Sequence, residues 1–426
     1  MEIAQLYQLY LQYPSIQTDT RKIKQGDLFF ALKGPNFNGN HFAAEALAKG
    51  AAYAVVDEPI DATNQRIIVT NNALITLQNL AKHHRQQFNI PFITITGSNG
   101  KTTTKELVST VLASHFTTYT TQGNLNNHIG VPLTILSIPL NAQMAVIEMG
   151  ANHQKEIESY CTYTLPTHGI ITNCGKAHLE GFGGEEGIKK GKGELYDYLK
   201  QNNGTAFVYW DYDYLQTMSI GIPNIIKYGT IEGIVTGKVD SNNPFLAVSV
   251  NKETLLSTIY TQLVGDYNLP NILCAVTIGK HFKVPDEKIK TAIENYIPSN
   301  SRSQLIEKGN NKIILDAYNA NPTSMKAAIE NFAAIVTDKK KIIFIGAMME
   351  MGDQSIQEHE QIIALLQQHV WEKVLLVGGD FKNVKHPYIY FSNSLEAKVY
   401  FNEQNFENSF CLIKGSRSIQ MEKILD

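Results

Sequence analysis

P-F-I-T-I-T-G-S-N-G-K-T-T-T-K-E-L occupies residues 91–107 and holds the most informative pattern in the chain. Its residues 92–96 are apolar or β-branched, which is the composition of a buried parallel strand. A turn with two glycines follows, and residues 101–112 have helix-forming character. A strand, a glycine-bearing turn and a helix N-terminus bring free backbone N–H groups and the positive end of a helix dipole to one point. The pattern therefore predicts a binding site for phosphate groups.

This turn is a shortened form of the common phosphate-binding loop. The usual pattern, G-x-x-x-x-G-K-[ST], would have its first glycine at Ile95, whereas this chain has G-x-x-G-K-T-T. The lysine supplies a cation for the β- and γ-phosphates, and a following threonine hydroxyl can ligate a phosphate-bound Mg²⁺. An ordinary glycine-rich turn is the alternative, but the strand before it and the helix after it favour a nucleoside triphosphate. The predicted ATP-binding residues here are Gly97, Ser98, Asn99, Gly100, Lys101, Thr102 and Thr103.

The bulk composition excludes several classes of protein. The chain has 426 residues, a hydrophobic fraction of 43% and a formal charge of −3, so it carries no basic excess for binding nucleic acid. Its four cysteines are scattered without a C-x-x-C pair, which indicates reduced packing residues and not disulfides or a zinc site. The N-terminus lacks the pattern of a signal peptide, and no apolar run approaches the roughly 18 residues of a membrane-spanning helix. We therefore expect a cytoplasmic protein.

Alternating strand and helix patterns predict an α/β protein with three domains. Residues 1–82 form a small α/β N-terminal domain. Residues 83–298 form a central P-loop domain with a parallel sheet, in which residues 204–261 are expected to be a mostly β excursion. A Ser- and Asn-rich linker follows, and residues 299–426 are predicted to be a doubly wound, Rossmann-like open sheet.

Two polar loops follow expected strands and are candidate ligand surfaces. Residues 33–41, K-G-P-N-F-N-G-N-H, combine hydrogen-bond donors with one aromatic side chain, which suits a sugar nucleotide, although composition alone favours a plain surface loop. Residues 120–134, T-T-Q-G-N-L-N-N-H-I-G-V-P-L-T, are so rich in Gln, Gly and Asn that they would make a poor core and a good polar surface for a ligand.

Glu148 stands inside an apolar strand pattern, M-A-V-I-E-M. A carboxylate buried in a strand is costly unless it is paired or ligates a metal. Because ligands of parallel sheets gather at the carboxyl ends of strands, metal binding is favoured over a structural ion pair. His178 follows another strand end and, with Glu148, suggests a second Mg²⁺ site near the phosphate loop. The lysines of the helix expected at residues 185–200 are interpreted as solvated surface.

Further candidates lie later in the chain. Asn268 and Asn271 lie one helical turn apart and could present their amides to a nucleobase. In the last domain, Asp316, Glu350 and Lys414 stand at strand ends, where ligands of an open sheet are expected.

Several stretches together resemble one family, the Mur ligases. They are T-D-T-R with G-D-L-F-F-A-L-K-G, the phosphate loop T-G-S-N-G-K-T-T-T-K-E, G-N-L-N-N-H-I-G-V-P-L-T, E-M-G-A-N-H, N-C-G-K-A-H-L-E-G-F-G, G-K-G-E, D-A-Y-N-A-N-P-T-S-M and K-G-S-R. They cover the whole chain in the order of the family. Two of them, D-A-Y-N-A-N-P-T-S-M and N-N-H-I-G-V-P-L-T, favour the member that adds a dipeptide.

The resemblance implies a function for each domain. In order, the domains would bind the UDP end of UDP-N-acetylmuramoyl-tripeptide, ATP, and the incoming D-alanyl-D-alanine. The tripeptide's terminal carboxylate would attack the γ-phosphorus of ATP, and the dipeptide's amine would attack the resulting acyl phosphate. Because that intermediate must be shielded from water, we expect the C-terminal domain to close on the other two. The family resemblance also implies a monomer.

The resemblance assigns roles to individual residues. Lys101 and Thr102 would hold the triphosphate and one Mg²⁺, and Glu148 and His178 the second Mg²⁺, while Lys192 matches a lysine that is carbamylated in the family. Asn268 and Asn271 would face adenine, Arg302 the phosphates and Asp316 the ribose. The predicted substrate-binding residues are Thr20, Arg21, Gly34, Asn38 and His41 at the UDP site, together with Asn124, Asn127, Asn319, Lys414 and Ser416.

Three departures from the family pattern affect the surroundings of ATP. Tyr267 replaces a common His, Ser301 replaces a common Gly, and a frequent pair of acids is reduced to Asp316 alone. The alternatives are another Mur step or folylpolyglutamate synthesis on the same fold, a switch that hydrolyses NTP without an acceptor, and a pseudoenzyme. The switch would have no use for Glu148, His178 or Lys192.

Overall fold

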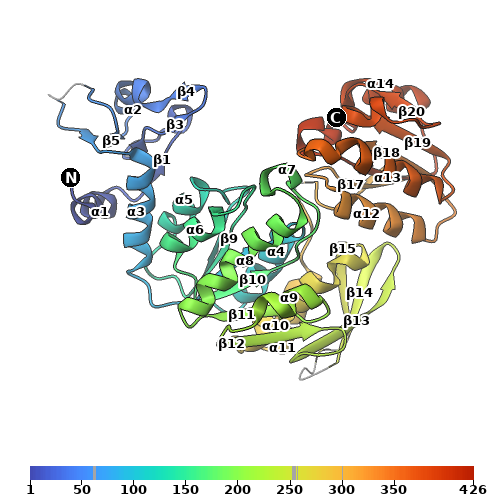
Figure 1. Cartoon of the computed structure of the whole chain (residues 1–426), viewed down its shortest axis with the longest axis horizontal. Helices are drawn as coiled ribbons and strands as arrows, with labels where there is room; N and C mark the ends of the chain where they lie inside the picture. Colours follow the sequence, from blue (N-terminus) through green and yellow to red (C-terminus); the bar gives the residue numbers. More distant parts are fainter. Residues whose placement is uncertain (61–63, 252–255, 257, 300) are drawn as a thin grey trace.

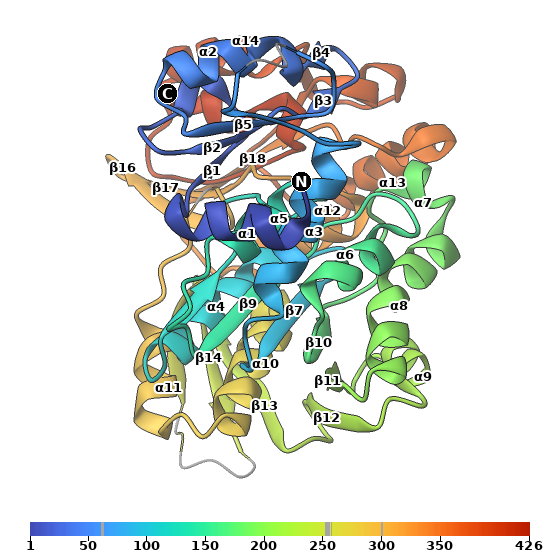
Figure 2. The same cartoon turned by 90° about the vertical axis from the view of Figure 1, so that its left-hand side faces the viewer.

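The computed structural model describes residues 1–60, 64–251, 256, 258–299 and 301–426. Figure 1 shows three units, the N-terminal one in blue, the central one from cyan to yellow and the C-terminal one in orange and red. The terminal units stand on opposite sides of the central one, and a quarter turn brings the N-terminal unit in front of the C-terminal unit (Figure 2). The predicted three-domain α/β architecture is confirmed. In the part of the chain described, no helix combines the length and apolar character needed to span a bilayer.

The N-terminal unit is a small parallel sheet with the strand order β1-β2-β5-β6. One sheet face packs on α2 through Phe29, Ala46 and Val56, and the other contributes Phe30 and Val55 to the main core. Between β2 and β5 the loop folds into a two-stranded hairpin, β3 and β4. The elements are α1 (Ile3–Gln12), β1 (Ile16–Gln17), β2 (Leu28–Phe30), β3 (Lys33–Gly34), β4 (Phe37–Asn38), α2 (Ala43–Ala48), β5 (Tyr53–Val56) and β6 (Ile67–Val69).

Helix α3 (Ala73–Arg85) joins this unit to the central one. The Asn72 side chain caps its first turn by accepting from the Ile75 backbone N–H. Its buried face, which includes Leu77 and Leu80, packs against α1 and also against α5 (Gly130–Leu136) and α6 (Glu156–Thr164) of the central unit. The predicted domain boundary at residue 82 therefore falls inside a continuous helix.

The central unit is built on a nine-stranded sheet with the order β15-β14-β13-β12-β11-β10-β7-β9-β8. The seven strands β7 to β13 run parallel to one another. Strand β14 pairs antiparallel with β13, and β15 pairs antiparallel with β14. The prediction that residues 204–261 form a mostly β segment apart from the parallel sheet is thus partly wrong, because β11 and β12 continue that sheet. The strands are β7 (Phe92–Thr96), β8 (Thr118–Thr120), β9 (Met144–Glu148), β10 (His168–Ile171), β11 (Thr205–Tyr209), β12 (Asn224–Gly229), β13 (Val235–Asn242), β14 (Phe245–Val250) and β15 (Ile259–Val264). The remaining helices are α4 (Lys101–Ala113), α7 (Leu179–Phe182), α8 (Glu185–Gln201), α9 (Asp213–Ser219), α10 (Leu269–His281) and α11 (Asp286–Glu294).

The C-terminal unit is a six-stranded sheet with the order β16-β17-β21-β18-β19-β20. The edge strand β16 is antiparallel and the others are parallel. Phe332 of α12 and Leu366 of α13 cover one face, while Phe401 of α14 covers the other, so the sheet is doubly wound as predicted. The elements are β16 (Gln304–Lys308), β17 (Asn311–Asp316), α12 (Pro322–Ala334), β18 (Lys340–Gly346), α13 (Ser355–Gln367), β19 (Lys373–Val377), β20 (Ile389–Phe391), α14 (Ser394–Gln404) and β21 (Ser409–Lys414).

Candidate active site

The phosphate loop joins the fully buried strand β7 to α4, as the sequence predicts. Gly97 has a φ of 141° and Gly100 a φ of 78°, in the region that side chains disfavour. A Cβ at Gly97 would also lie 2.0 Å from Thr172 Oγ1. The loop is fastened to the end of β10, since Ser98 Oγ donates to the Gly175 carbonyl (2.7 Å) and the Asn99 N–H donates to Asn173 Oδ1 (3.0 Å). These constraints hold the loop backbone in one conformation.

Lys101 lies folded over this loop. Its ammonium donates to the carbonyls of Gly97 (2.7 Å) and Ser98 (3.0 Å). Burial lowers the pKa of Lys101 to about 8, against the opposing effect of the Glu148 carboxylate and with a smaller contribution from the Arg302 cation in the same direction as burial. The ammonium group therefore already lies at the loop, and a small change of side-chain conformation would bring it to a phosphate bound there.

Glu148 is buried at the carboxyl end of β9, beside β7, with 1% of its surface exposed. Its Oε2 accepts from Thr102 Oγ1 (2.9 Å) and its Oε1 from Asn126 Nδ2 (2.8 Å). Both donors are neutral, so these are not the contacts of a structural ion pair. Mg²⁺ is usually held by one or two carboxylates together with substrate phosphates and waters, and the oxygens of Glu148 and Thr102 are donors of that kind. Across the described residues, no three His, Cys, Asp or Glu side chains form a metal cluster by themselves.

His178 contacts the C-terminal unit. It has a φ of 54° before α7, and its Nδ1 pairs closely with Glu350 Oε2. The hydrogen bond from His178 lowers the pKa of the Glu350 carboxyl, although partial burial opposes it. Its role as a metal ligand stays a prediction, while its observed partner is an acid that the sequence analysis had placed at a strand end.

Lys192 is buried in α8, with 1% of its surface exposed. The prediction that the lysines of this helix are solvated is wrong for this residue. Its Nζ donates to the Ala151 carbonyl (2.9 Å) and lies 4.7 Å from the centre of the Phe182 ring. Burial, aided by the Lys101 cation, lowers the pKa of Lys192 to about 7. Near neutral pH, much of this lysine is therefore a neutral amine.

Asn268 and Asn271 are buried and hydrogen-bonded within the protein. They are 4% and 7% exposed, and Asn271 Nδ2 donates to Asn268 Oδ1 (2.9 Å). Asn268 Nδ2 donates to the Val264 carbonyl (2.9 Å), and Asn271 Oδ1 accepts from Thr104 Oγ1 (2.9 Å). The pair thus fastens α10 to α4, and its contact with adenine stays a prediction.

Tyr267 and Asp316 both contact Ser303, just before β16. Tyr267 hydrogen-bonds Ser303 Oγ (2.9 Å), whose backbone N–H donates to Asp316 Oδ1 (3.1 Å). Ser301 has a φ of 56°, in the left-handed region that favours glycine. The Arg302 guanidinium stacks 3.5 Å from the Tyr318 ring centre.

The C-terminal candidates are tied to one another. Lys414 Nζ lies 2.5 Å from Asp316 Oδ2 and 3.4 Å from the Asn319 carbonyl. Ser416 Oγ donates to the Ala320 carbonyl (3.2 Å). Asp316, predicted to bind the ribose, thus already has two internal donors.

Contacts between units join further residues that the sequence analysis did not single out. Asn321 Nδ2 donates to Asn99 Oδ1 of the phosphate loop (2.7 Å), and Asn321 also caps α12. Lys176 Nζ pairs with Glu358 (2.8 Å), whose side chain is 3% exposed. Asn321 and Lys176 do lie within the quoted motifs, but motifs cannot indicate which side chains meet across two domains.

The predicted UDP-site residues lie on the N-terminal unit. Gly34 and Asn38 belong to the β3–β4 hairpin, and His41 is exposed just after it. Arg21 is exposed beside Thr20 and donates to Asp19 (2.8 Å). On the central unit Asn124 is exposed, and Asn127 Oδ1 accepts from the Gly130 backbone N–H (2.9 Å) at the start of α5.

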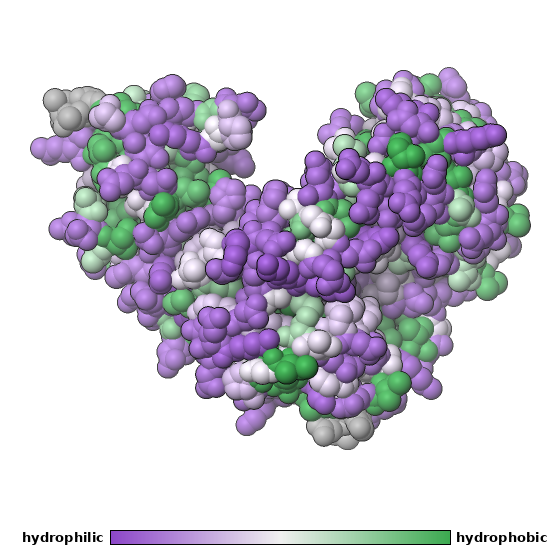
Figure 3. Space-filling view, viewed as in Figure 1, coloured by the Kyte–Doolittle hydropathy of each residue, from purple (hydrophilic) through white to green (hydrophobic). Residues whose placement is uncertain are grey.

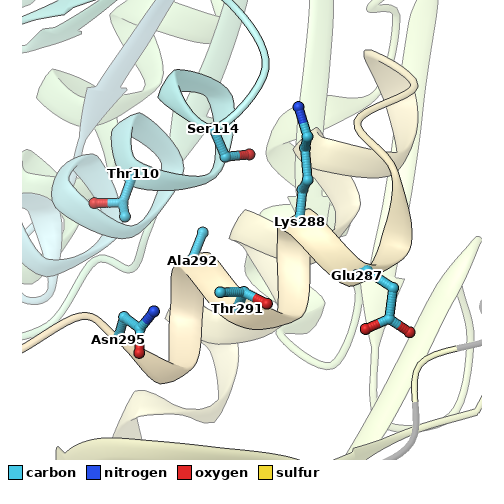
Figure 4. A pocket seen from close by; sticks show the side chains of 7 residues that line it. All are labelled: Thr110, Ser114, Glu287, Lys288, Thr291, Ala292 and Asn295. Atoms are coloured by element: carbon cyan, nitrogen blue, oxygen red, sulfur yellow. The ribbon is translucent and has the colours of Figure 1, made fainter.

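The molecular surface between the two terminal units is hollowed and largely hydrophilic (Figure 3). A separate cavity of about 420 Å³ lies between α4 and α11, lined by Thr110, Ser114, Glu287, Lys288, Thr291, Ala292 and Asn295 (Figure 4). It contains none of the predicted site residues. A second cavity, of about 370 Å³, includes Lys105 and Gln122 and lies closer to the carboxyl edge of β8.

Known proteins match the chain along its length. The Mur ligase family catalytic domain matches residues 12–96, the Mur ligase middle domain residues 95–279 and the Mur ligase glutamate ligase domain residues 301–402. The UDP-N-acetylmuramoyl-tripeptide–D-alanyl-D-alanine ligase of Bacillus subtilis (strain 168) is 31% identical, over 96% of this chain and 92% of its own length. Among solved structures, MurF from Acinetobacter baumannii has a TM-score of 0.87 at 31% identity, over 96% of this chain and 92% of that one. MurF ligase from Thermotoga maritima in complex with ADP has a TM-score of 0.87 at 25% identity, over 97% of each chain.

Proposed function

The chain belongs to the Mur ligase family, and we propose that it is the member that joins D-alanyl-D-alanine to UDP-N-acetylmuramoyl-tripeptide. The reaction consumes ATP, forms a C–N bond and yields UDP-N-acetylmuramoyl-pentapeptide for peptidoglycan synthesis. The observation that carries this assignment is the agreement over nearly the whole chain with relatives of that one activity. The phosphate loop and the buried Glu148 meet at one sheet edge, as such a reaction requires.

The first chemical step uses the phosphate loop. The loop N–H groups and Lys101 hold the β- and γ-phosphates and stabilise the negative charge on their oxygens. The terminal carboxylate of the tripeptide attacks the γ-phosphorus in line, ADP leaves, and an acyl phosphate forms. The amine of the dipeptide then attacks the acyl carbon, and the collapse of the tetrahedral intermediate expels phosphate and leaves the amide.

The residues present suit Mg²⁺, which we include in the proposal. Thr102 and Glu148 would hold it, with His178 and Lys192 as the further predicted ligands. When bound, Mg²⁺ would neutralise phosphate oxygens and reduce their repulsion of the attacking carboxylate. The neutral amine is the form of lysine that adds CO₂, and the lowered pKa of Lys192 supports its carbamylation.

The C-terminal unit supplies the dipeptide side of the reaction in this proposal. Asn319, Lys414 and Ser416 lie together there, and Asn321 reaches the phosphate loop itself. Closure of this unit would exclude water from the acyl phosphate. In this proposal the chain acts in the cytoplasm, and it acts as a monomer, as the family resemblance implies.

Phosphate release from ATP and Mg²⁺ tests the assignment. It is measured with UDP-N-acetylmuramoyl-tripeptide, bearing either lysine or diaminopimelate, with and without D-alanyl-D-alanine, and the product is weighed by mass spectrometry. Release that needs both substrates and gives the pentapeptide is the expected result, and Lys101→Met should abolish it. Release that responds to another amine would move the chain to a different ligation step. Hydrolysis indifferent to every acceptor would refute the ligase.

A further inference from the structure

The β3–β4 hairpin, which carries predicted UDP-site residues, is too small to hold its own shape. Its two strands pair through two registers, Lys33 with Asn38 and Gly34 with Phe37. An isolated two-stranded hairpin is marginal in water even when it is longer. Phe37 at the tip is 57% exposed, and its ring lies over Gly34, where a Cβ would be 2.3 Å from Phe37 Cε1. The conformation of this hairpin must therefore be set from outside it.

Asn40 and Asp57 form a reciprocal pair at the base of the hairpin. Asn40 Nδ2 donates to Asp57 Oδ1 (2.8 Å), and the Asp57 backbone N–H donates to Asn40 Oδ1 (3.0 Å). Asn40 is 1% exposed and the Asp57 side chain 9%. Asn40 Nδ2 also donates to Asn38 Oδ1 (2.8 Å), so every polar atom of the Asn40 amide is in use. The pair joins the residue after β5 to the second residue after β4.

Lys33 and Glu58 add a second fastening at the hairpin stem. Lys33 Nζ lies 3.0 Å from Asp57 Oδ1 and 3.0 Å from Glu58 Oε1. Asn38 Nδ2 donates to both Glu58 oxygens (3.0 and 3.1 Å). The amide of Asn38, predicted to bind UDP, is thus engaged within the protein and helps to shape the loop.

Asp57 also connects the hairpin to the rest of the molecule. Its Oδ2 accepts from the Ala73 backbone N–H (3.2 Å), the first residue of α3. A carboxylate at a helix N-terminus is favoured by the helix dipole. Burial opposes ionisation of Asp57, but the hydrogen bonds from Asn40, Lys33 and Ala73 together leave its pKa below the usual value. One ionised carboxylate therefore holds the hairpin and the helix that leads to the phosphate loop.

We propose that Asn40 and Asp57 are positioning residues for the UDP end of the substrate. Their reciprocal hydrogen bonds hold the β3–β4 hairpin in its binding conformation and fix it relative to α3. The inference rests on the proposed function, because it takes the substrate to be a UDP sugar bound by the N-terminal unit. It predicts an effect on that substrate and none on ATP.

Titration calorimetry with UDP-N-acetylmuramoyl-tripeptide in the absence of ATP tests this role. Asn40→Ala and Asp57→Asn should each weaken binding on the order of tenfold, because each leaves a buried partner unsatisfied. KM for the UDP substrate should rise by a similar factor, with kcat and KM for ATP unchanged. The exchange variant N40D/D57N keeps an acceptor for the backbone N–H of residue 57. It places a carboxylate against Asn38 Oδ1 and removes one acceptor from Lys33 and the Ala73 N–H, so it should bind no better than the single variants. Glu232→Gln, at an exposed ion pair with Lys227 on the central unit, is the control.

Three results would overturn the inference. The first is wild-type affinity for the UDP substrate in both single variants. The second is a parallel loss of ATP binding and thermal stability, which would indicate a general folding role. The third is an exchange variant that binds the UDP substrate as tightly as the wild type, since the contacts with Asn38 and α3 would then have no part in binding. Failure of the wild-type chain to bind the UDP substrate would instead refute the proposed function, and the inference with it, so the wild-type titration separates the two.

Discussion

Replacing Glu148 with glutamine separates the charge of this side chain from its contacts. Glutamine has nearly the same shape, so its carbonyl oxygen can accept from Asn126 Nδ2 as Oε1 does now (2.8 Å). Its amide can donate to Thr102 Oγ1, since that hydroxyl can rotate from donor to acceptor. Both hydrogen bonds survive, and the free energy of unfolding should change by less than about 1 kcal/mol.

Activity should respond far more strongly to E148Q than stability does. The variant removes the carboxylate charge of the proposed Mg²⁺ site, and charge stabilisation by such a metal is worth several kcal/mol. A loss of about 3–4 kcal/mol corresponds to roughly 10²–10³-fold in kcat. The Glu148 carboxylate also raises the pKa of Lys101, so E148Q should lower that pKa and shift the residual activity toward lower pH.

The assay combines chemical denaturation with ligase kinetics over a range of Mg²⁺ concentrations. Glu148→Ala is the control, because it abolishes both hydrogen bonds and leaves two buried donors, at a cost of about 1–3 kcal/mol for each. Wild-type kcat and Mg²⁺ dependence in E148Q would refute the metal role of Glu148. If E148Q were as destabilised as E148A, glutamine would not keep the hydrogen bonds to Thr102 and Asn126, and that part of the reasoning would be refuted.

Three further variants test other parts of the structure. Lys192→Met should be inactive, yet its melting temperature at about pH 7 without bicarbonate should be higher than that of the wild type. Burial lowers the pKa of Lys192 to about 7 in the folded protein, so above that pH the unfolded wild type binds more protons than the folded one. The wild type therefore gains stability as pH rises, and the advantage of the variant should vanish toward about pH 10.5. Lys176→Met strands the buried Glu358 carboxylate and should cost about 1–2 kcal/mol in denaturation, less than a fully buried pair because Lys176 is 31% exposed; unchanged stability would contradict the pairing. Tyr267→Phe removes the hydrogen bond to Ser303 and should cost about 1 kcal/mol while scattering reports a looser C-terminal unit; an unaltered scattering curve would count against its linker role.

Local patterns predicted the elements that build the site. β7 has the residues expected of it, and α4 begins at Lys101 as predicted, because a buried β-branched run and a glycine turn fix their own conformation. Glu148 was also identified correctly as a buried carboxylate at a strand end. Its exceptional position could be recognised from the apolar residues beside it.

Other features depend on packing between distant segments and left no local signal. Lys192 stands in a helix rich in charged residues, and only the fold shows that its position faces the core. Asn268 and Asn271 have the spacing of ligand-facing amides, but the same spacing serves to fasten one helix to another. The side-chain pairs between units join distant residues: Asn99 and Asn321 are 222 positions apart, and Lys176 and Glu358 are 182 apart. The periodicity of a single sequence does not indicate which distant side chain a residue will contact.

The continuous helix α3 fixes the distance between the N-terminal unit and the phosphate loop. A helix is stiff, and the 13 residues of α3 span about 20 Å at roughly 1.5 Å per residue. Under the proposed function, in which the N-terminal unit binds the UDP end, the sugar nucleotide and the reacting carboxylate are then held at a set separation. One amino acid more or fewer in the peptide stem would shift that carboxylate by up to about 3.5 Å, more than the tolerance of an in-line attack. The selection of a tripeptide over shorter or longer stems would then be made by length, without any pocket that recognises its third residue.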